Sequence, residues 1–220
     1  MVTNSEKIRL LLKEFPHTYS EELGINLKSK NPKEIFKWFL ASILFGHRIS
    51  ETIAKNTYRE FEKEGLLTPD KILDAGWDEL VCVLDNGGYV RYDFSTASAL
   101  LDIMKNLKEK YGSLEKLYEV SIDSKDLKKR LQEFKIIGPV TTNIFLRELR
   151  AVWPKTNPEL SKFVKIGVKN LRINLNKINR KTKKFVHLES ALLRLGKDYC
   201  NKKKCNICRF ICLKRKIYKR

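Results

Sequence analysis

Apolar residues recur three and four positions apart along most of this 220-residue chain, and this spacing limits the possible folds more than any other feature. The stretch from Pro32 to residue 47 and the stretch 93–111 show it most clearly, each with an apolar stripe broad enough for a buried helix face. Strand signals are scarce, and no repeat or low-complexity linker interrupts the pattern. The sequence therefore predicts an all-α fold class.

Caps and turn residues divide this pattern into separate helices. Asp85–Gly88 forms a strong break, and Pro69 is suited to a first helical position. We expect Cys82 to be a core thiol because it lies in the apolar run LVCVL. Further helices are predicted over residues 5–14 and 51–63, from Pro69, from Ser124 to Phe134 and after Gly138-Pro139, and Trp38, Trp77 and Trp153 are predicted core residues.

The positive charge of the chain is concentrated at its C-terminal end. Residues 1–159 contain 25 basic and 24 acidic residues, whereas residues 160–220 contain 20 basic and 2 acidic ones, so most of the net charge of +19 lies there. Such a block favours a polyanion as partner. Nucleic acid is the leading candidate, and an anionic membrane surface and simple solubility are the alternatives. Apolar residues recur among the nine Lys and Arg between Ser161 and Leu188, so we expect a folded basic face.

No targeting segment is visible in the sequence. Glu6, Lys7 and Arg9 stand where a secretory peptide needs an apolar region. The longest apolar stretch, residues 35–46, contains Lys37 and is shorter than the roughly 20 residues of a membrane span. We expect a soluble, cytoplasmic protein with no membrane partner.

Four cysteines, Cys200, Cys205, Cys208 and Cys212, follow a C-x4-C-x2-C-x3-C spacing. In an intracellular chain such a cluster indicates a metal site rather than disulfides. Four thiolates suit either a [4Fe–4S] cluster or a structural zinc ion.

The segment from Ser124 to Arg150 predicts a helix, a tight turn and a second helix. Gly138 permits a sharp turn, and Pro139 opens the second helix. The amides of Val140 and Thr141 in that first turn lack partners within the helix and can hold a phosphate oxygen. A helix connection without a ligand is the alternative.

Four segments of the chain resemble motifs of the endonuclease III-like helix-hairpin-helix superfamily of DNA glycosylases. FKIIGPVTT (134–142) resembles its hairpin signature, WFLASILFGHRIS (38–50) its early helix, GGYVRYDFSTASALL (87–101) its central segment, and the final cysteine run its iron–sulfur loop. The resemblance covers most of the chain.

This resemblance implies two helical domains with a DNA-binding cleft between them. One is a six-helix barrel, residues 30–143, which ends in the helix-hairpin-helix; the other joins residues 1–29 to 144–220 and carries the cluster loop 200–212. The implied protein is a monomer that flips a damaged or mismatched base out of duplex DNA and cuts its glycosidic bond. The implied cofactor is a [4Fe–4S] cluster held by the four cysteines, with zinc as the alternative.

The catalytic positions of the family are only partly matched. Val140 stands where strand-cutting members have a lysine, which implies a monofunctional glycosylase unless Lys135 or Lys165 replaces that lysine. Glu159 is the only acid between Arg150 and Leu188 and is the candidate catalytic carboxylate, with a solvated turn glutamate as the alternative. Glu148 is a weaker candidate and is expected to form an exposed pair with Arg147.

The resemblance also implies a set of DNA contacts. His47 stands where the family has the glutamine that fills the space of the flipped base, and Ile136 replaces the usual first glycine of the hairpin. A non-catalytic protein that binds damaged DNA through the same fold is the main alternative. The predicted DNA-binding residues are His47, Ile137, Gly138, Val140 and Thr141, with Tyr89 and Tyr92 as additional candidates.

Overall fold

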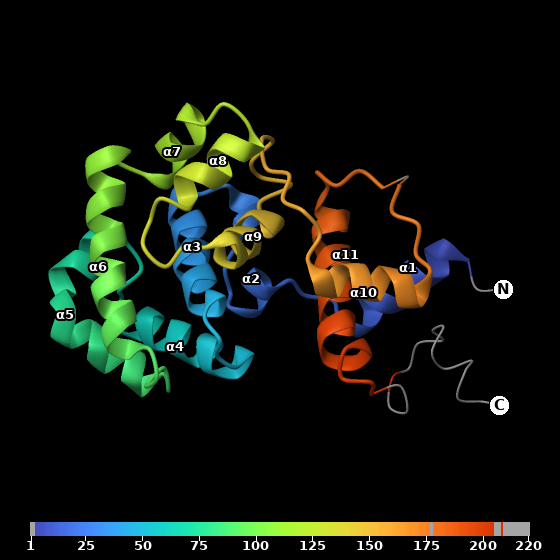
Figure 1. The fold of residues 1–220 in the computed structure, drawn as a ribbon, viewed down its shortest axis with the longest axis horizontal. Helices are drawn as coiled ribbons and strands as arrows, with labels where there is room; N and C mark the ends of the chain where they lie inside the picture. Colours follow the sequence, from blue (N-terminus) through green and yellow to red (C-terminus); the bar gives the residue numbers. More distant parts are fainter. Residues whose placement is uncertain (1–2, 177, 205–207, 209–220) are drawn as a thin grey trace. The chain divides into compact units, whose positions relative to one another are not determined.

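The computed structural model describes residues 3–176, 178–204 and 208, and all regular elements in these ranges are helical (Figure 1). No strand occurs in them, which confirms the all-α prediction. The chain divides into two compact units, Leu23–Thr156 and Met1–Glu22 with Asn157–Arg220. The first and last parts of the chain thus share one unit. Its borders lie between residues 22 and 23 and between residues 156 and 157, whereas the sequence analysis predicted borders after residues 29 and 143.

The continuous unit is built around one buried helix, α3. Asn31 caps α3 and Pro32 takes its first position. The Trp38 indole donates to the Phe145 carbonyl at 3.0 Å, which ties α3 to α9 inside the core. The helices of this unit are α3 (Pro32–Gly46), α4 (Glu51–Lys63), α5 (Pro69–Asn86), α6 (Asp93–Lys110), α7 (Leu114–Val120), α8 (Ser124–Leu131) and α9 (Pro139–Glu148), and a 3₁₀ turn, η1 (Leu27–Ser29), precedes them.

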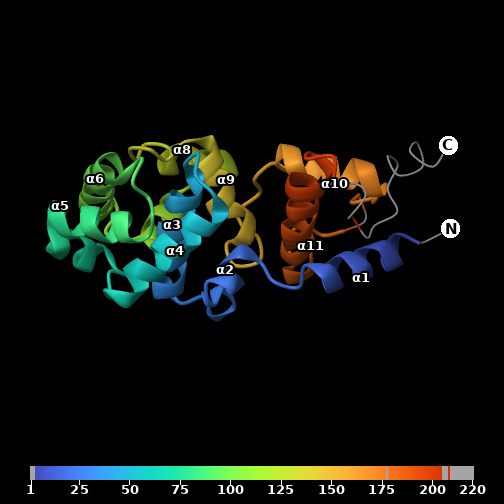
Figure 2. The ribbon, with the colours of Figure 1, turned by 90° about the horizontal axis from the view of Figure 1, so that it is seen from below.

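The views in Figures 1 and 2 place α3 among α4, α7 and α9, and these three helices pack against it. Helices α5 and α6 form the most extensive helix pair of the unit. Although α3 is strongly apolar, it lies inside the unit. None of the described helices has both the length and the apolar character that crossing a bilayer requires.

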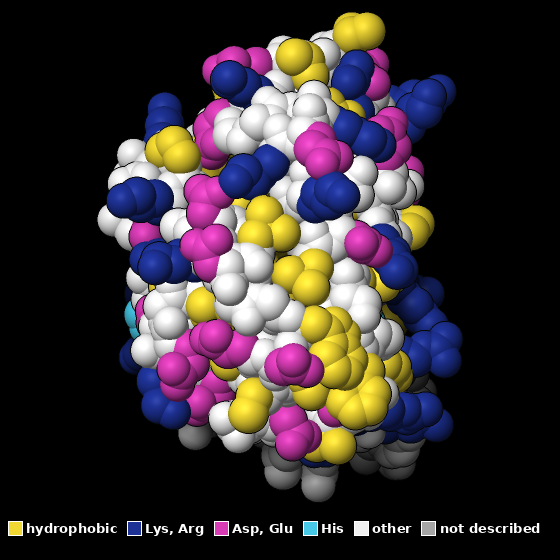
Figure 3. Space-filling view, turned by 90° about the vertical axis from the view of Figure 1, so that its left-hand side faces the viewer, with side chains coloured by type: hydrophobic (Ala, Val, Ile, Leu, Met, Phe, Trp, Pro, Cys, Tyr) yellow, Lys and Arg dark blue, Asp and Glu magenta, His cyan; other side chains and the backbone are white. Residues whose placement is uncertain are grey.

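Two residues of α5 predicted to lie in the core are exposed instead. Trp77 is 40% exposed, and Cys82 is exposed as well. The reason is Gly76, whose φ of +73° interrupts the helical geometry of α5. The spacing of apolar residues before Gly76 therefore does not predict which residues of α5 are buried after it. Trp77 instead contacts exposed Phe94, with ring centroids 5.4 Å apart. Apolar side chains are visible among charged ones on the face at the α5–α6 end (Figure 3). Trp38 and Trp153 are buried as predicted.

A lysine closes the C-terminal end of α7. The Lys155 ammonium donates to the carbonyls of Tyr118, Glu119 and Ser121 at 3.0, 2.9 and 2.7 Å. It also lies 4.8 Å from the centre of the Tyr118 ring. One side chain thus donates to three carbonyl groups at the end of the helix, of which Tyr118 also accepts from the Ser121 N–H at 3.3 Å.

We expect Lys155→Met to lower the free energy of unfolding by about 2 kcal/mol, because hydrogen bonds to a charged donor are lost while the stem is retained. Urea unfolding followed by circular dichroism measures this change. Lys125→Met, at an exposed position on α8, is the control and should change stability by less than about 0.5 kcal/mol. Equal effects of the two substitutions would contradict the capping role.

The discontinuous unit contains much of the basic block. Its helices are α1 (Asn4–Glu14), α2 (Tyr19–Glu22), α10 (Lys162–Leu171) and α11 (Lys183–Arg194), and a π-helical turn, η2 (Leu195–Cys200), follows α11. A Cβ atom on Gly196 would overlap the carbonyl of Phe163, so α10 and η2 approach closely through this glycine. Val164 and Leu171 of α10 are buried. The prediction of a folded basic region is therefore confirmed for the described residues.

Candidate nucleic-acid interface

The candidate interface begins at the first turn of α9. Gly138 occupies the N-cap position without a side-chain cap, and Pro139 is the first helical residue. The N–H groups of Val140 and Thr141 make no hydrogen bond in the described part of the chain. The Val140 side chain is 64% exposed, so this turn opens to solvent. Unpaired amides at a helix N-terminus favour an anionic group such as a phosphate.

The turn before α9 differs from the expected one in where its left-handed residue lies. Gly138 has φ −87° and ψ −175°, which is ordinary extended backbone. The left-handed residue is Ile136, with φ +58°. Phe134 before Ile136 and Ile137 after it are both buried in the core. The chain therefore changes direction between two buried side chains. The prediction that Gly138 makes the sharp turn is wrong, and its Cβ position faces open space.

The end of α3 lies directly against this first turn of α9. A Cβ atom on Gly46 would lie only 3.1 Å from the Cβ of Thr141, which is tighter than ordinary packing allows. Thr141 is buried, so Gly46 permits the close approach of the two helices. His47 directly follows Gly46 and is the C-cap residue of α3. It therefore lies beside the point where α3 approaches α9.

His47 lies in an aromatic environment. Its ring centroid is 5.7 Å from that of Tyr89 and 5.0 Å from that of Tyr92. The Nε2 atom of His47 is buried and has no hydrogen-bond partner among the described residues. Burial lowers the pKa of the imidazole, so the ring is neutral at neutral pH. A buried ring nitrogen without a partner is costly, and a ligand that reached it would remove that cost.

The lowered pKa of His47 predicts a pH dependence of stability. Since the folded pKa lies below the unfolded value of about 6.5, the unfolded chain binds more protons in this window, and His47 destabilises the fold as pH falls through it. His47→Gln should therefore lose less stability than the wild type between about pH 7 and pH 5 in urea unfolding experiments. His17→Gln, at an exposed position, is the control and should follow the wild-type curve. Identical curves for all three proteins would contradict this prediction.

The other predicted DNA contacts are differently placed. The side chain of Ile137 is buried, so only its main chain faces the turn. Tyr89 is fully buried and donates from its hydroxyl to the Leu44 carbonyl at 2.7 Å, which assigns it to the core. Tyr92 is half-buried beside His47. The structure thus brings together Gly138, Val140 and Thr141 on α9 with His47 on α3 through the Gly46 contact.

The carboxylate candidates lie elsewhere in the chain. Glu159 is exposed and belongs to the discontinuous unit, in the segment before Ser161 caps α10. Glu148 and Arg147 are 3% and 6% exposed, so the prediction of an exposed pair is wrong. They lie in the last turn of α9. The sequence around them did not indicate that this turn is buried.

Of the two lysines considered as replacement nucleophiles, Lys135 is engaged in an ion pair. Its ammonium lies 3.1 Å from the Asp102 carboxylate. Lys165 is exposed on α10, in the discontinuous unit. Attack by the Lys135 amine on a sugar would first require this ion pair to break.

The cysteine cluster lies at the end of the described chain. Cys200 closes η2 and is buried, and Cys208 is buried as well. Cys205 and Cys212 lie outside the described residues. Among the described residues no three His, Cys, Asp or Glu side chains gather as metal ligands. A buried thiol is shielded from solvent, which suits the environment of a metal ligand.

Contacts between distant segments created the parts of the interface that the sequence analysis missed. Neither the Gly46–Thr141 approach nor the aromatic contacts of His47 leaves a local signal, because each joins residues far apart in the chain. Comparisons with known proteins supply no relative for the chain: no protein-family model matches it, and no curated protein matches it.

Proposed function

We propose that this protein binds duplex DNA through the first turn of α9 and removes a damaged or mismatched base from it as an endonuclease III-like glycosylase. The observation that carries the proposal is the open turn at Val140 and Thr141, with the ring of His47 at the adjoining end of α3. The amides suit a backbone phosphate, and the neutral imidazole suits the space near an extruded base. The helix-turn-helix geometry of α8 and α9 is compatible with a helix-hairpin-helix motif.

The charge of the chain supports nucleic acid as the partner. Residues 160–220 carry 20 basic and 2 acidic residues, and the described part of this region is folded on α10 and α11. A folded basic surface attracts duplex DNA through its phosphates, and this attraction weakens as salt concentration rises. We propose that the protein acts on DNA as a monomer.

The reaction we propose is hydrolysis of the bond between the base and C1′ of the sugar. The bond to the base breaks, positive charge develops on the sugar, and the Glu159 carboxylate stabilises this charge. The electron pair of the broken bond leaves with the base, water adds at C1′, and the carboxylate accepts a proton from this water. Protonation of the departed base and release of the proton from the carboxylate, both through solvent, complete the hydrolysis. Val140 offers no amine at the position of the family lysine, so the strand itself stays intact.

A four-cysteine metal centre belongs to the proposal as a structural element. Cys200, Cys205, Cys208 and Cys212 would hold a [4Fe–4S] cluster, or zinc in the alternative, and the group would shape the adjoining basic loop. The buried positions of Cys200 and Cys208 support this assignment. The loop around them contains Lys202, Lys203 and Lys204, which suit contact with phosphate.

Protein purified without oxygen is expected to contain about four iron and four sulfide ions per chain. Cys208→Ser should lose most of both because the fourth thiolate is missing, whereas Cys82→Ser, at the exposed cysteine of α5, should retain them. Elemental analysis and a sulfide assay measure both quantities. Stoichiometric zinc without sulfide would favour the structural zinc site, and retention of iron in Cys208→Ser would contradict the ligand set.

The test of the function is incubation of the protein with duplexes that each carry one damaged, mismatched or abasic site. Products are separated on denaturing gels with and without hot alkali. Breaks that require alkali indicate the proposed monofunctional glycosylase. Breaks without alkali, with a covalent adduct trapped by borohydride, indicate a relocated lysine and a bifunctional enzyme. DNA that is bound but unchanged across the panel would overturn catalysis and favour a binding protein.

A further inference from the structure

The discontinuous unit contains a cavity of about 780 Å³ between α1 and α11. Ile8 and Leu12 of α1 and Leu188 of α11 give it an apolar wall, and Arg9 and Lys184 line it from the same two helices. The spacing explains this arrangement, since Ile8 and Leu12 are one turn apart on α1 and Lys184 and Leu188 are one turn apart on α11.

The positive charge of this cavity is only partly compensated, since Arg9 interacts electrostatically with the Glu6 carboxylate three residues earlier on α1. No acidic side chain is among the described residues that line it. Arg9 and Lys184 are both exposed, and neither forms an ion pair with a described residue. Glu6, the acid nearest to Arg9 in sequence, accepts hydrogen bonds from the main chain and hydroxyl of Thr3 at the start of α1. Two cations beside an apolar wall thus face the same space.

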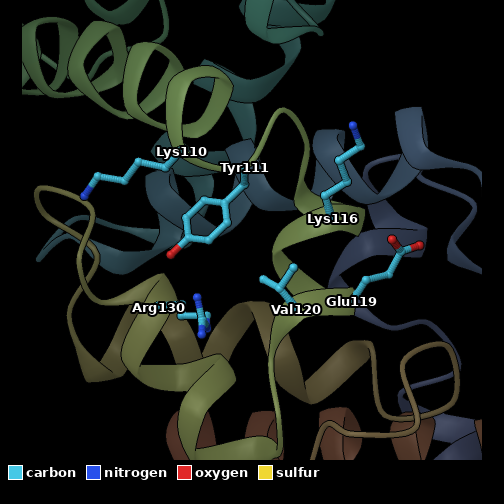
Figure 4. A pocket seen from close by; sticks show the side chains of 6 residues that line it. All are labelled: Lys110, Tyr111, Lys116, Glu119, Val120 and Arg130. Carbon is cyan, nitrogen blue, oxygen red and sulfur yellow. The ribbon is translucent and has the colours of Figure 1, made fainter.

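A second cavity, of about 460 Å³, shows the contrast (Figure 4). It has three cationic lining residues instead of two, but Arg130 is 2.9 Å from Asp126 and Lys110 is 3.9 Å from Glu133. Glu119 also lines this cavity, and in Figure 4 the Val120 side chain lies between Glu119 and Arg130. Ion pairs therefore balance two of its cations. In the α1–α11 cavity, Arg9 has only the electrostatic interaction with Glu6, and Lys184 forms no ion pair with a described residue.

Polar contacts hold the walls of the α1–α11 cavity in place. Asn4 donates to the Asn174 carbonyl at 3.3 Å and accepts from its N–H at 3.1 Å, which ties α1 to the segment before α11. Thr182 caps α11 by accepting from the Phe185 N–H. Asn4 and Thr182 both line the cavity near the positive end of a twelve-residue helix. The Thr182 hydroxyl donates to the Asn179 carbonyl at 2.9 Å, so the donor that the rim offers is the second N–H of the Asn4 amide. Such a rim suits the oxygen atoms of a phosphate ester.

We propose that this cavity binds a nucleotide, with the phosphate between Arg9 and Lys184 and the base against Ile8, Leu12 and Leu188. A phosphate monoester carries nearly two negative charges at neutral pH and matches the two cations. The volume lies within the range of small-molecule sites. The nucleotide can be free or part of a DNA strand. The site does not depend on base excision, because it requires neither Glu159 nor the first turn of α9.

Calorimetric titration of the full chain with dAMP and with deoxyadenosine tests the proposal. We expect dAMP to bind and deoxyadenosine to bind much more weakly. Arg9→Gln with Lys184→Gln should weaken dAMP binding about tenfold or more, because two charged hydrogen-bond donors are lost. The matched control, Lys13→Gln with Lys183→Gln, removes the same charge from the same helices outside the cavity and should leave binding within about twofold. Equal losses in the two variants would overturn the site.

Titration with an undamaged duplex distinguishes the two sources of the nucleotide. If dAMP does not bind but the duplex binds more weakly to the cavity variant than to the control, the nucleotide of a DNA strand is the ligand and the proposal stands. If dAMP does not bind and the two variants bind the duplex equally, the proposal fails. Binding of decanoate without binding of dAMP would also overturn it in favour of an alkyl carboxylate. Base excision on the duplex panel decides the proposed function separately from all these outcomes.

Discussion

Glu159→Gln is expected to reduce the rate of base excision by about 10²- to 10⁴-fold, the usual contribution of a positioned acid–base group. Glutamine keeps the shape of the side chain but loses the negative charge that stabilises the cationic sugar. Glu159 is exposed, so the substitution should leave the fold unchanged. DNA affinity should be retained or increase slightly, because one negative charge is removed from a basic region.

The control for this substitution is Asp198→Asn, which removes the same charge from the same unit. Asp198 pairs with Lys202 at 3.2 Å, on the chain segment that leads to the cysteine loop. Single-turnover excision on the preferred duplex should be almost unchanged in this variant. Full activity of Glu159→Gln would place the catalytic carboxylate elsewhere, and an equal loss in both variants would point to a general charge effect.

Gly46→Ala is expected to destabilise the continuous unit by about 3 kcal/mol, because the added methyl group would press α3 away from α9 at Thr141. The severe overlap is with the Thr141 Oγ1, whereas the Thr141 Cβ, at 3.1 Å from the added methyl group, makes a milder tight contact. The midpoint temperature of thermal unfolding should fall by roughly 6–12 °C for a chain of this size. DNA affinity should fall as well, because the displaced first turn of α9 carries the proposed phosphate site.

A double-mutant cycle tests this explanation. Thr141→Ala removes the side chain that the new methyl group meets, so the double variant should recover a large part of the stability lost by Gly46→Ala alone. Gly138→Ala is the matched control at the same interface and should change stability by less than about 0.5 kcal/mol, because its Cβ position is open and its φ is ordinary. Additive effects of Gly46→Ala and Thr141→Ala would contradict the proposed contact.

Local signals predicted most of the helices. The starts of α3, α5 and α9 follow from Pro32, Pro69 and Pro139, each of which takes a first helical position. The short helices α2 and α7 were missed because a few residues carry little periodicity. Helices α10 and α11 were expected only as part of a folded basic face, because both begin among lysines. Helix α8 begins at Ser124 as predicted, with Asp123 as its cap, but it ends at Leu131 rather than Phe134.

The candidate site was less predictable than the helices. The unpaired amides of Val140 and Thr141 follow directly from Gly138-Pro139, because proline and glycine supply neither a side-chain cap nor a bulky neighbour. The left-handed Ile136 was not predictable, because a β-branched residue disfavours that conformation and the surrounding core must impose it. The burial of Glu148 also depends on packing rather than on local sequence.

The most direct test of the account is to follow the backbone amide resonances of the full chain while it is titrated with a duplex that contains one abasic site. The account predicts that the Val140 and Thr141 amides shift most strongly within the continuous unit, that the His47 ring resonances move with them, and that all saturate at one duplex per chain. The amide of Lys125 on α8 is the internal reference and should move little. Shifts confined to residues 160–220, with Val140 and Thr141 unchanged at saturation, would contradict the interface at α9.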